Sequence, residues 1–182
     1  MTVGVVFETH ATSEDNERGI ATGWLGGALS AAGREQAREL GARRRDDGLD
    51  AVYASDLNRA VETARIAFGD DAAVMLDWRL RECDYGDWNG MPRSRLDAER
   101  GRHVDEPWPG GESWGQAVER VDGLLDELAA TRNGQRVLVI GHVATRWALE
   151  RRVCGRPLEE LAAEEFVWEP GWEYELPPGL AR

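Results

Sequence analysis

Two histidines and one arginine stand just after three short apolar stretches of this sequence. His10 follows the apolar residues 5–7, Arg59 lies shortly after residues 50–54, and His142 follows residues 137–140 with one glycine between. Short, β-branched runs of this kind are typical of buried strands. Because the carboxyl ends of parallel strands lie along one edge of a sheet, we expect these three side chains to meet in one pocket.

A pocket with this composition favours an anion, and a phosphoryl group suits it best. A neutral histidine can attack phosphorus and form a phosphohistidine. The second histidine and Arg59 can hold the phosphoryl oxygens and offset their developing charge. The leaving oxygen then needs a proton. Glu82 is the candidate donor, because burial near Trp88 would raise the pKa of its carboxyl group.

The elements that must position these residues alternate between strands and helices. We predict strands over residues 2–7, 50–54, 74–76, 137–140, 164–168 and 172–176, and helices over 30–46, 57–68, 113–134 and 144–152. This order predicts a mostly parallel sheet with helices on both faces, in a single domain over residues 1–182. Two long connections, 8–29 and 77–112, are expected to be functional. The second is irregular, with a short helix over 94–102, and should cover the substrate.

The composition restricts the kinds of molecule that this protein is expected to bind. The chain has 182 residues, a formal net charge of −12 and no lysine, so an anion can be bound only by arginine, histidine or backbone N–H groups. An acidic surface argues against nucleic acid and membrane surfaces as partners. We find no apolar run that could span a bilayer and no signal peptide, and therefore expect a cytoplasmic protein. Cys83 and Cys154 form no disulfide framework, and no zinc motif is present.

Six short segments, in order along nearly the whole chain, match the pattern of one family. They are Thr9-His10-Ala11 with Asn16, 29–33 with Gln36-Ala37, Ser55–Ala60 with Thr63-Ala64, 80–82, 86–90 with 111–113, and 139–142. Each segment is weakly diagnostic alone, but six in order are specific. By these segments the chain resembles the histidine phosphatase superfamily, the phosphoglycerate-mutase-like proteins.

The resemblance implies a three-layer α/β/α sandwich and phosphoryl transfer that needs neither metal nor cofactor. It implies His10 as the nucleophile and Glu82 as the proton donor, with Arg59, His142 and Asn16 holding the phosphate. The other expected substrate contacts flank the two histidines, and they are Thr9, Ala11, Thr12 and Val143. The expected substrate is a small phosphomonoester, hydrolysed through a phosphohistidine by a monomer or homodimer.

The residues beside His10 depart from the family pattern. The family has arginine where this chain has Thr9, and glycine where it has Ala11. A charge-assisted arginine–phosphate contact is worth about 1.5–3 kcal/mol, so its loss should cost roughly 10- to 150-fold unless it is replaced. Arg81 and Arg146 are candidate replacements. Ala11 requires a backbone conformation that accepts a Cβ atom.

Three functions therefore remain open from the sequence. The first is a phosphatase. The second is a divergent member that acts on a neutral or weakly anionic substrate by His/Glu acid–base chemistry, and the third is a catalytically impaired binding protein. Mutase activity is less expected, because no long cap is apparent that would shield an intermediate from water. Trp168 and Trp172 are expected at a strand edge or an interface.

Overall fold

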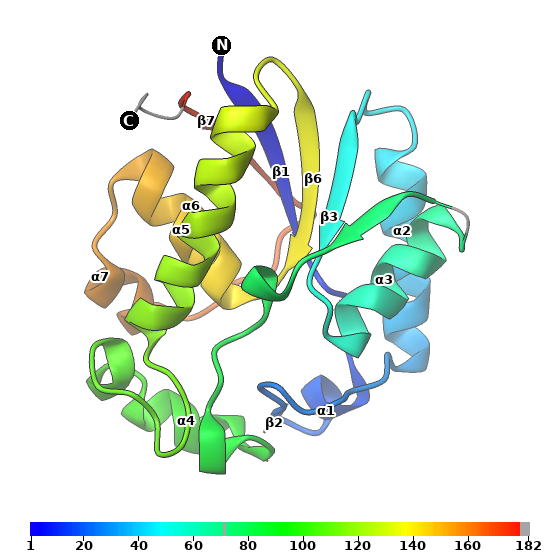
Figure 1. The fold of residues 1–182 in the computed structure, drawn as a ribbon. Helices are drawn as coiled ribbons and strands as arrows, with labels where there is room; N and C mark the ends of the chain where they lie inside the picture. The colour runs from blue at the N-terminus through cyan, green and yellow to red at the C-terminus, as the bar shows by residue number, and fades with distance from the viewer. Residues whose placement is uncertain (71, 179–182) are drawn as a thin grey trace.

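The computed structural model describes residues 1–70 and 72–178, and it is built around a five-stranded sheet (Figure 1). The last four residues of the predicted 1–182 domain lie outside this part. The strands are β1 (Val3–Thr9), β3 (Ala51–Ala54), β4 (Val74–Leu76), β6 (Arg136–Gly141) and β7 (Trp172–Leu176), in the order β4-β3-β6-β1-β7. Only β7 is antiparallel, and it pairs with β1. The predicted, mostly parallel sheet is confirmed.

Helices cover both faces of this sheet, which gives the three layers expected (Figure 1). On one face, α2 (Ala31–Arg44) packs against α3 (Asn58–Phe68). On the other, α5 (Trp114–Thr131) packs against α6 (Val143–Cys154), with α7 (Leu158–Ala163) beside α6. Serine side chains begin α2 and α5, because Ser30 and Ser113 accept the backbone N–H of the third helical residue in each case. Such caps satisfy otherwise unpaired donors at a helix start.

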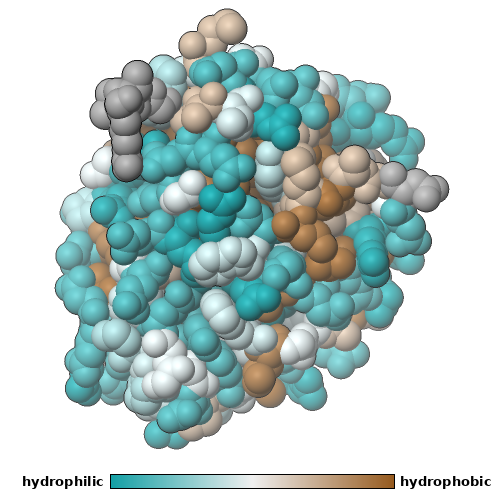
Figure 2. Space-filling view, in the orientation of Figure 1, coloured by the Kyte–Doolittle hydropathy of each residue, from teal (hydrophilic) through white to brown (hydrophobic). Residues whose placement is uncertain are grey.

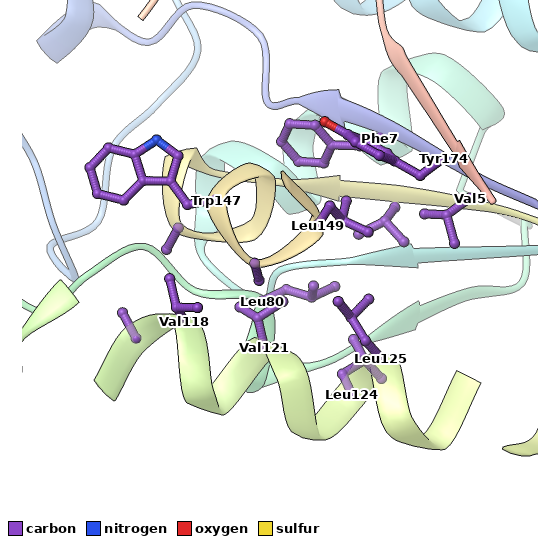
Figure 3. Packing of buried hydrophobic residues seen from close by; sticks show 14 of the residues in the cluster. Val5, Phe7, Leu80, Val118, Val121, Leu124, Leu125, Trp147, Leu149 and Tyr174 are labelled. Atoms are coloured by element: carbon purple, nitrogen blue, oxygen red, sulfur yellow. The ribbon is translucent and has the colours of Figure 1, made fainter. Parts of the chain in front are cut away.

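The main core lies between α5 and the sheet. Val118, Val121 and Leu125 recur at the spacing of one helix face and are fully buried. Figure 3 shows the labelled side chains of this helix pointing toward the sheet, where β1 carries Val5 and Phe7. The continuous apolar run 137–140 in β6 is also fully buried, as expected of a central strand that is covered on both faces.

The two long connections meet at the carboxyl ends of the parallel strands. The first contains α1 (Glu14–Glu17) and β2 (Ile20–Ala21). The second contains η1 (Trp78–Leu80), η2 (Gly86–Trp88), β5 (Met91–Pro92), α4 (Arg93–Glu99) and η3 (Arg102–Val104). β2 pairs with β5, so the two connections form one small antiparallel sheet. Figure 1 shows α1, β2 and α4 gathered at one end of the central sheet. We call these two connections together the cap.

One predicted strand is wrong. Residues 164–168 form no strand, and they belong to an irregular connection between α7 and β7. The alternation of Phe166 and Trp168 suggested a strand, but both side chains line a cavity instead of facing a sheet partner. The sequence reasoning also missed α7 and α1. These helices have six and four residues, too few for a periodic pattern to distinguish them from loop.

The surface and the cysteines are consistent with the composition. Hydrophilic residues dominate the face in Figure 2, with hydrophobic residues in smaller groups. Across residues 1–70 and 72–178, none of the helices has the length and apolar character needed to cross a membrane. Cys83 is buried, Cys154 is exposed, and neither forms a disulfide.

Candidate active site

The structure brings His10, Arg59 and His142 into direct contact. His10 follows β1, Arg59 lies in the first turn of α3, and His142 directly precedes α6. The Arg59 Nε atom lies 3.3 Å from His10 Nε2, and its Nη2 atom lies 3.4 Å from His142 Nδ1. The two imidazole rings are 4.9 Å apart between centroids. One guanidinium therefore bridges both imidazoles at the carboxyl edge of the sheet.

Arg59 is held in this position by the first cap connection. Its Nη2 atom donates to the carbonyl of Gly23 at 2.9 Å, and the side chain is almost fully buried. Gly23 has φ of +55°, and a Cβ atom there would lie 1.7 Å from Asn89 Oδ1, so glycine is required. The glycine-rich loop of residues 19–27 thus positions the guanidinium of Arg59. Burial lowers the pKa of Arg59, and the charge of Glu82 opposes this shift.

His10 is oriented as a neutral nucleophile. Its Nδ1 atom lies 2.7 Å from the carbonyl oxygen of Ala11, which favours a proton on Nδ1 and a lone pair on Nε2. Burial, and then the charge of Arg59, lowers the pKa of His10 to about 3. The ring is therefore uncharged at neutral pH, and its Nε2 atom is the one that faces Arg59.

His142 is neutral for the same reasons. It is almost fully buried, and burial followed by the charges of Arg59 and His10 holds its pKa well below the usual range. Its Nε2 atom has no hydrogen-bond partner within the described residues. A buried nitrogen without a partner is costly, which is typical of a group kept for a ligand.

Glu82 lies where its carboxyl group faces the start of α6. Its Oε1 atom accepts from the N–H groups of Cys83 at 3.0 Å and Ala144 at 3.3 Å, and its Oε2 atom accepts from Val143 at 3.4 Å. Burial raises the pKa of this carboxyl group, while these N–H groups and Arg59 lower it. A raised pKa suits a group that must carry a proton to a leaving oxygen.

A cavity of about 510 Å³ opens beside these residues. Of the other predicted contacts, Thr9, Thr12, Asn16 and Val143 line it. The Oδ1 atom of Asn16 accepts from the N–H and hydroxyl groups of Ser13, which leaves the NH₂ group of Asn16 as the end available to a substrate.

Ala11 does not line this cavity. It is buried, and its N–H donates to the hydroxyl of Thr63 at 3.0 Å, so the structure gives it no direct substrate contact. Its carbonyl orients His10 instead. No described residue other than glycine has a positive φ, so alanine is accommodated at this position without strain.

Neither proposed replacement for the missing arginine reaches the cavity. Arg81 forms a bidentate ion pair with Asp56, at 2.7 and 2.6 Å, and lies over the ring of Trp24. The Arg146 guanidinium lies 4.5 Å from the ring centroid of Trp172. Both are thus occupied elsewhere, and neither replaces the family's arginine at position 9.

Two arginines of the cap line the cavity instead. Arg93 and Arg100 flank Asp97, with nitrogen–oxygen distances of 3.4 and 3.6 Å. Sequence reasoning missed all three residues. Their i, i+4, i+7 spacing, at and after the start of the helix predicted over 94–102, was the only available signal, and it is equally typical of a solvated face.

Five aromatic side chains form much of the remaining wall. They are Tyr85, Trp108, Trp114, Phe166 and Trp168. Trp108 and Trp114 are nearly fully buried and also contribute to the main core. Trp168 is 54% exposed and stands at the cavity rather than at a strand edge or an interface, which corrects the prediction for this residue.

No three histidine, cysteine or acidic side chains within the described residues are grouped so that they could hold a metal ion.

The fold agrees with comparisons to known proteins. The family model of the histidine phosphatase superfamily (branch 1) matches residues 5–167. The chain belongs to this superfamily. It has the three-layer, mostly parallel α/β/α architecture of the phosphoglycerate-mutase-like proteins.

The similar proteins include both phosphatases and mutases. A 2,3-bisphosphoglycerate-dependent phosphoglycerate mutase of Parvibaculum lavamentivorans is 34% identical over 76% of this chain and 73% of its own. Phosphoserine phosphatase 1 of Hydrogenobacter thermophilus is 32% identical over 87% of this chain and 79% of its own. A mycobacterial glucosyl-3-phosphoglycerate phosphatase, solved with VO3, has a TM-score of 0.77 at 26% identity, covering 88% of this chain and 86% of its own.

Proposed function

We propose that this protein is a metal-independent phosphatase that hydrolyses a small phosphomonoester through a phosphohistidine on His10. One observation carries the proposal. The guanidinium of Arg59 bridges two neutral imidazoles, beside a carboxyl group, Glu82, whose pKa is raised. This arrangement supplies a nucleophile, a cation for phosphoryl oxygens and a proton donor in one cavity.

The geometry supports a two-step reaction. In the first step, Nε2 of His10 attacks phosphorus, the bond to the leaving oxygen breaks, and Glu82 gives that oxygen its proton. Before this attack, when the ester binds, the N–H groups of Arg59 turn from His10 to the phosphoryl oxygens, which frees the Nε2 lone pair. His142 and Asn16 also donate to these oxygens. Because His142 is neutral, its donor is the ring N–H. In the second step, Glu82 takes a proton from a water molecule as the water oxygen attacks phosphorus. The bond between phosphorus and His10 Nε2 then breaks, and inorganic phosphate is released.

Arg59 also supports the metal-independent form of the reaction. Its nitrogens lie 3.3 and 3.4 Å from the two imidazoles, the ligands that a metal ion would need. A cation placed there would be repelled by the guanidinium at short range and low dielectric. The guanidinium itself provides the positive charge that a metal ion supplies in other phosphatases.

Hydrolysis is favoured over mutase activity by the openness of the cap. The longest helix of the cap, α4, has only seven residues, and Trp168 at the cavity is half exposed. Water can thus reach a phosphohistidine before a released product returns. The phosphatase names among the relatives support the same choice, and their mutase names make it worth testing.

Thr9 is the observation that favours a second candidate function. With Thr9 where the family has arginine, and both histidines neutral, Arg59 is the cation at the reacting end of the cavity. A neutral or weakly anionic substrate would meet less excess charge there. His10, Glu82 and His142 would then act by acid–base chemistry.

The two functions are separated by phosphate release. Wild type and His10→Ala are assayed with p-nitrophenyl phosphate and a panel of sugar, nucleotide and glycerate phosphates, with a chelator present. Release by the wild type alone supports the phosphatase. Equal release by His10→Ala contradicts the phosphohistidine. No release, together with no binding of vanadate at millimolar concentration, favours the second candidate.

A further inference from the structure

The connection between α7 and β7 brings a tryptophan to the cavity and holds it there. The Arg44 guanidinium donates to the carbonyl of Pro170 at 3.1 Å, which anchors the end of this connection. Phe166, earlier in the same connection, packs against Trp172 with ring centroids 6.0 Å apart. Trp168 lies between these two fixed points. The chain is therefore anchored on both sides of Trp168.

Trp168 stands beside the position at which this chain departs from its family. Thr9 and Trp168 both line the main cavity, and both also line a small adjoining cavity of about 10 Å³ with Gln36. The Thr9 hydroxyl is buried and has no hydrogen-bond partner among the described residues. An arginine at position 9 could not fit the small cavity and would extend into the main one. The short threonine thus leaves room next to the indole.

The size and lining of the main cavity exceed what a phosphoryl group needs. At about 510 Å³ it falls within the roughly 300–1,000 Å³ range of sites that enclose a drug-sized ligand. A three-carbon ester would leave most of it empty. Aromatic side chains supply much of the wall, and half-exposed tryptophan at a ligand cavity is typical of a stacking surface.

We propose that Trp168, in the room left by Thr9, stacks on a ring in the leaving group, so that the preferred substrate is a phosphomonoester that carries a planar, apolar ring. This inference rests on the proposed phosphatase function and specifies its substrate class. Trp168 is then a specificity-determining residue. The site lacks the arginine–phosphate contact that the family pattern has at position 9. Binding of the ring offsets part of the binding energy lost with that contact.

The test uses two esters that differ only in the ring. Benzyl phosphate and ethyl phosphate are both esters of primary alcohols, so their leaving groups have similar basicity. We expect the wild-type kcat/KM to be higher for benzyl phosphate. Trp168→Ala should lower the benzyl-to-ethyl ratio by about threefold to tenfold, the range of one aromatic contact. Trp168→Phe should retain most of the ratio.

Val167→Ala is the matched control on the same connection. Val167 is 65% exposed and does not line the cavity, so its loss should leave the ratio unchanged. Thr9→Arg should lower the ratio, because the new side chain occupies the space beside Trp168, and it should raise kcat/KM for ethyl phosphate. An unchanged ratio in Trp168→Ala, or an equal change in Val167→Ala, would overturn the inference.

A binding experiment keeps this inference separate from the proposed function. Benzylphosphonate and ethylphosphonate are not hydrolysed, and calorimetry measures their affinities without turnover. If the wild type releases no phosphate but binds benzylphosphonate more tightly, and Trp168→Ala removes that preference, the ring subsite stands while the phosphatase function fails. Equal affinity of the wild type for both phosphonates would overturn the ring subsite.

Discussion

The reacting end of the cavity and the rest of its wall are built in different ways. At the reacting end, His10, Arg59 and His142 follow central strands and contact one another while largely buried. The rest of the wall comes mainly from the cap and the α7–β7 connection. Arg93 and Trp168, for example, are about half exposed. The sheet thus fixes the positions of the reacting side chains, whereas substrate specificity depends on side chains that a few substitutions could replace.

The difference predicts where substitutions matter most. At the reacting end a lost group leaves buried, unpaired partners behind and removes a contact to the transition state. In the rest of the wall a lost group is partly replaced by water. Large, substrate-independent losses should therefore come from the first region, and modest, substrate-dependent changes from the second.

Glu82→Gln should have the largest effect. Glutamine cannot protonate the leaving oxygen, so formation of the phosphoenzyme from ethyl phosphate should slow by about 100- to 10,000-fold. The first turnover of p-nitrophenyl phosphate should slow far less, because p-nitrophenolate leaves without a proton. Rapid-mixing kinetics measure both steps. An equal slowing of the two esters would show that Glu82 is not the acid.

The low pKa of His10 predicts a dependence of stability on pH. Below about pH 6.5 an unfolded histidine gains a proton. Folded His10 stays neutral until about pH 3, so its contribution to stability falls as the pH falls through this window. His10→Gln removes this loss. When the pH is lowered from 8 to 5, the free energy of unfolding of His10→Gln should therefore gain about 1–2 kcal/mol relative to that of the wild type.

Urea denaturation of both proteins at pH 8 and pH 5 measures this change. Parallel losses of stability in wild type and His10→Gln would show that His10 is not held neutral by the fold.

Thr9→Val should stabilise the protein. Valine has nearly the same shape as threonine but lacks the buried hydroxyl that has no partner here. Removing an unsatisfied buried group should raise the free energy of unfolding by about 1 kcal/mol. This corresponds to a rise in Tm of roughly 2–4 °C for a chain of this size. Calorimetry measures the shift, and a lower Tm would mean that the hydroxyl has a partner in the folded protein.

Arg93→Ala should have the smallest effect. An exposed charge contributes at most about 1 kcal/mol, so KM for a phosphate ester should rise by up to about fivefold at low salt and less at high salt. Arg95→Ala is the control on the same helix, because the Arg95 guanidinium lies over the ring of Trp88 and does not line the cavity. Equal effects of the two variants would mean that only the overall charge matters.

The sequence predicted the reacting end because local rules decide it. Short apolar strands place the residue that follows them at one edge of a parallel sheet, whatever the rest of the chain does. His10, Arg59 and His142 could therefore be placed together before any coordinates. The glycine-rich loop was identified as functional from its length alone, but its role as the acceptor for Arg59 was not, because that contact joins residues 36 positions apart.

The rest of the cavity wall was not predictable, because tertiary contacts decide it. Phe166 and Trp168 alternate as strand residues do, and only the pairing of β7 with β1 and the anchoring of Pro170 place them at the cavity. Arg93 and Arg100 carry no local signal that distinguishes a cavity wall from a solvated helix face. Arg81 and Arg146 neighbour predicted site residues in sequence, yet Asp56 and Trp172 hold them elsewhere.

The central claim is a covalent phosphohistidine on His10, and trapping it is the most direct measurement. Enzyme mixed with an ester carrying radiolabelled phosphate is denatured within milliseconds, and the labelled peptide is identified. We expect label on His10 that is stable to base and lost in acid, absent from His10→Ala and unaffected by a chelator. Continued turnover with no label on the protein, or label on another residue, would contradict it.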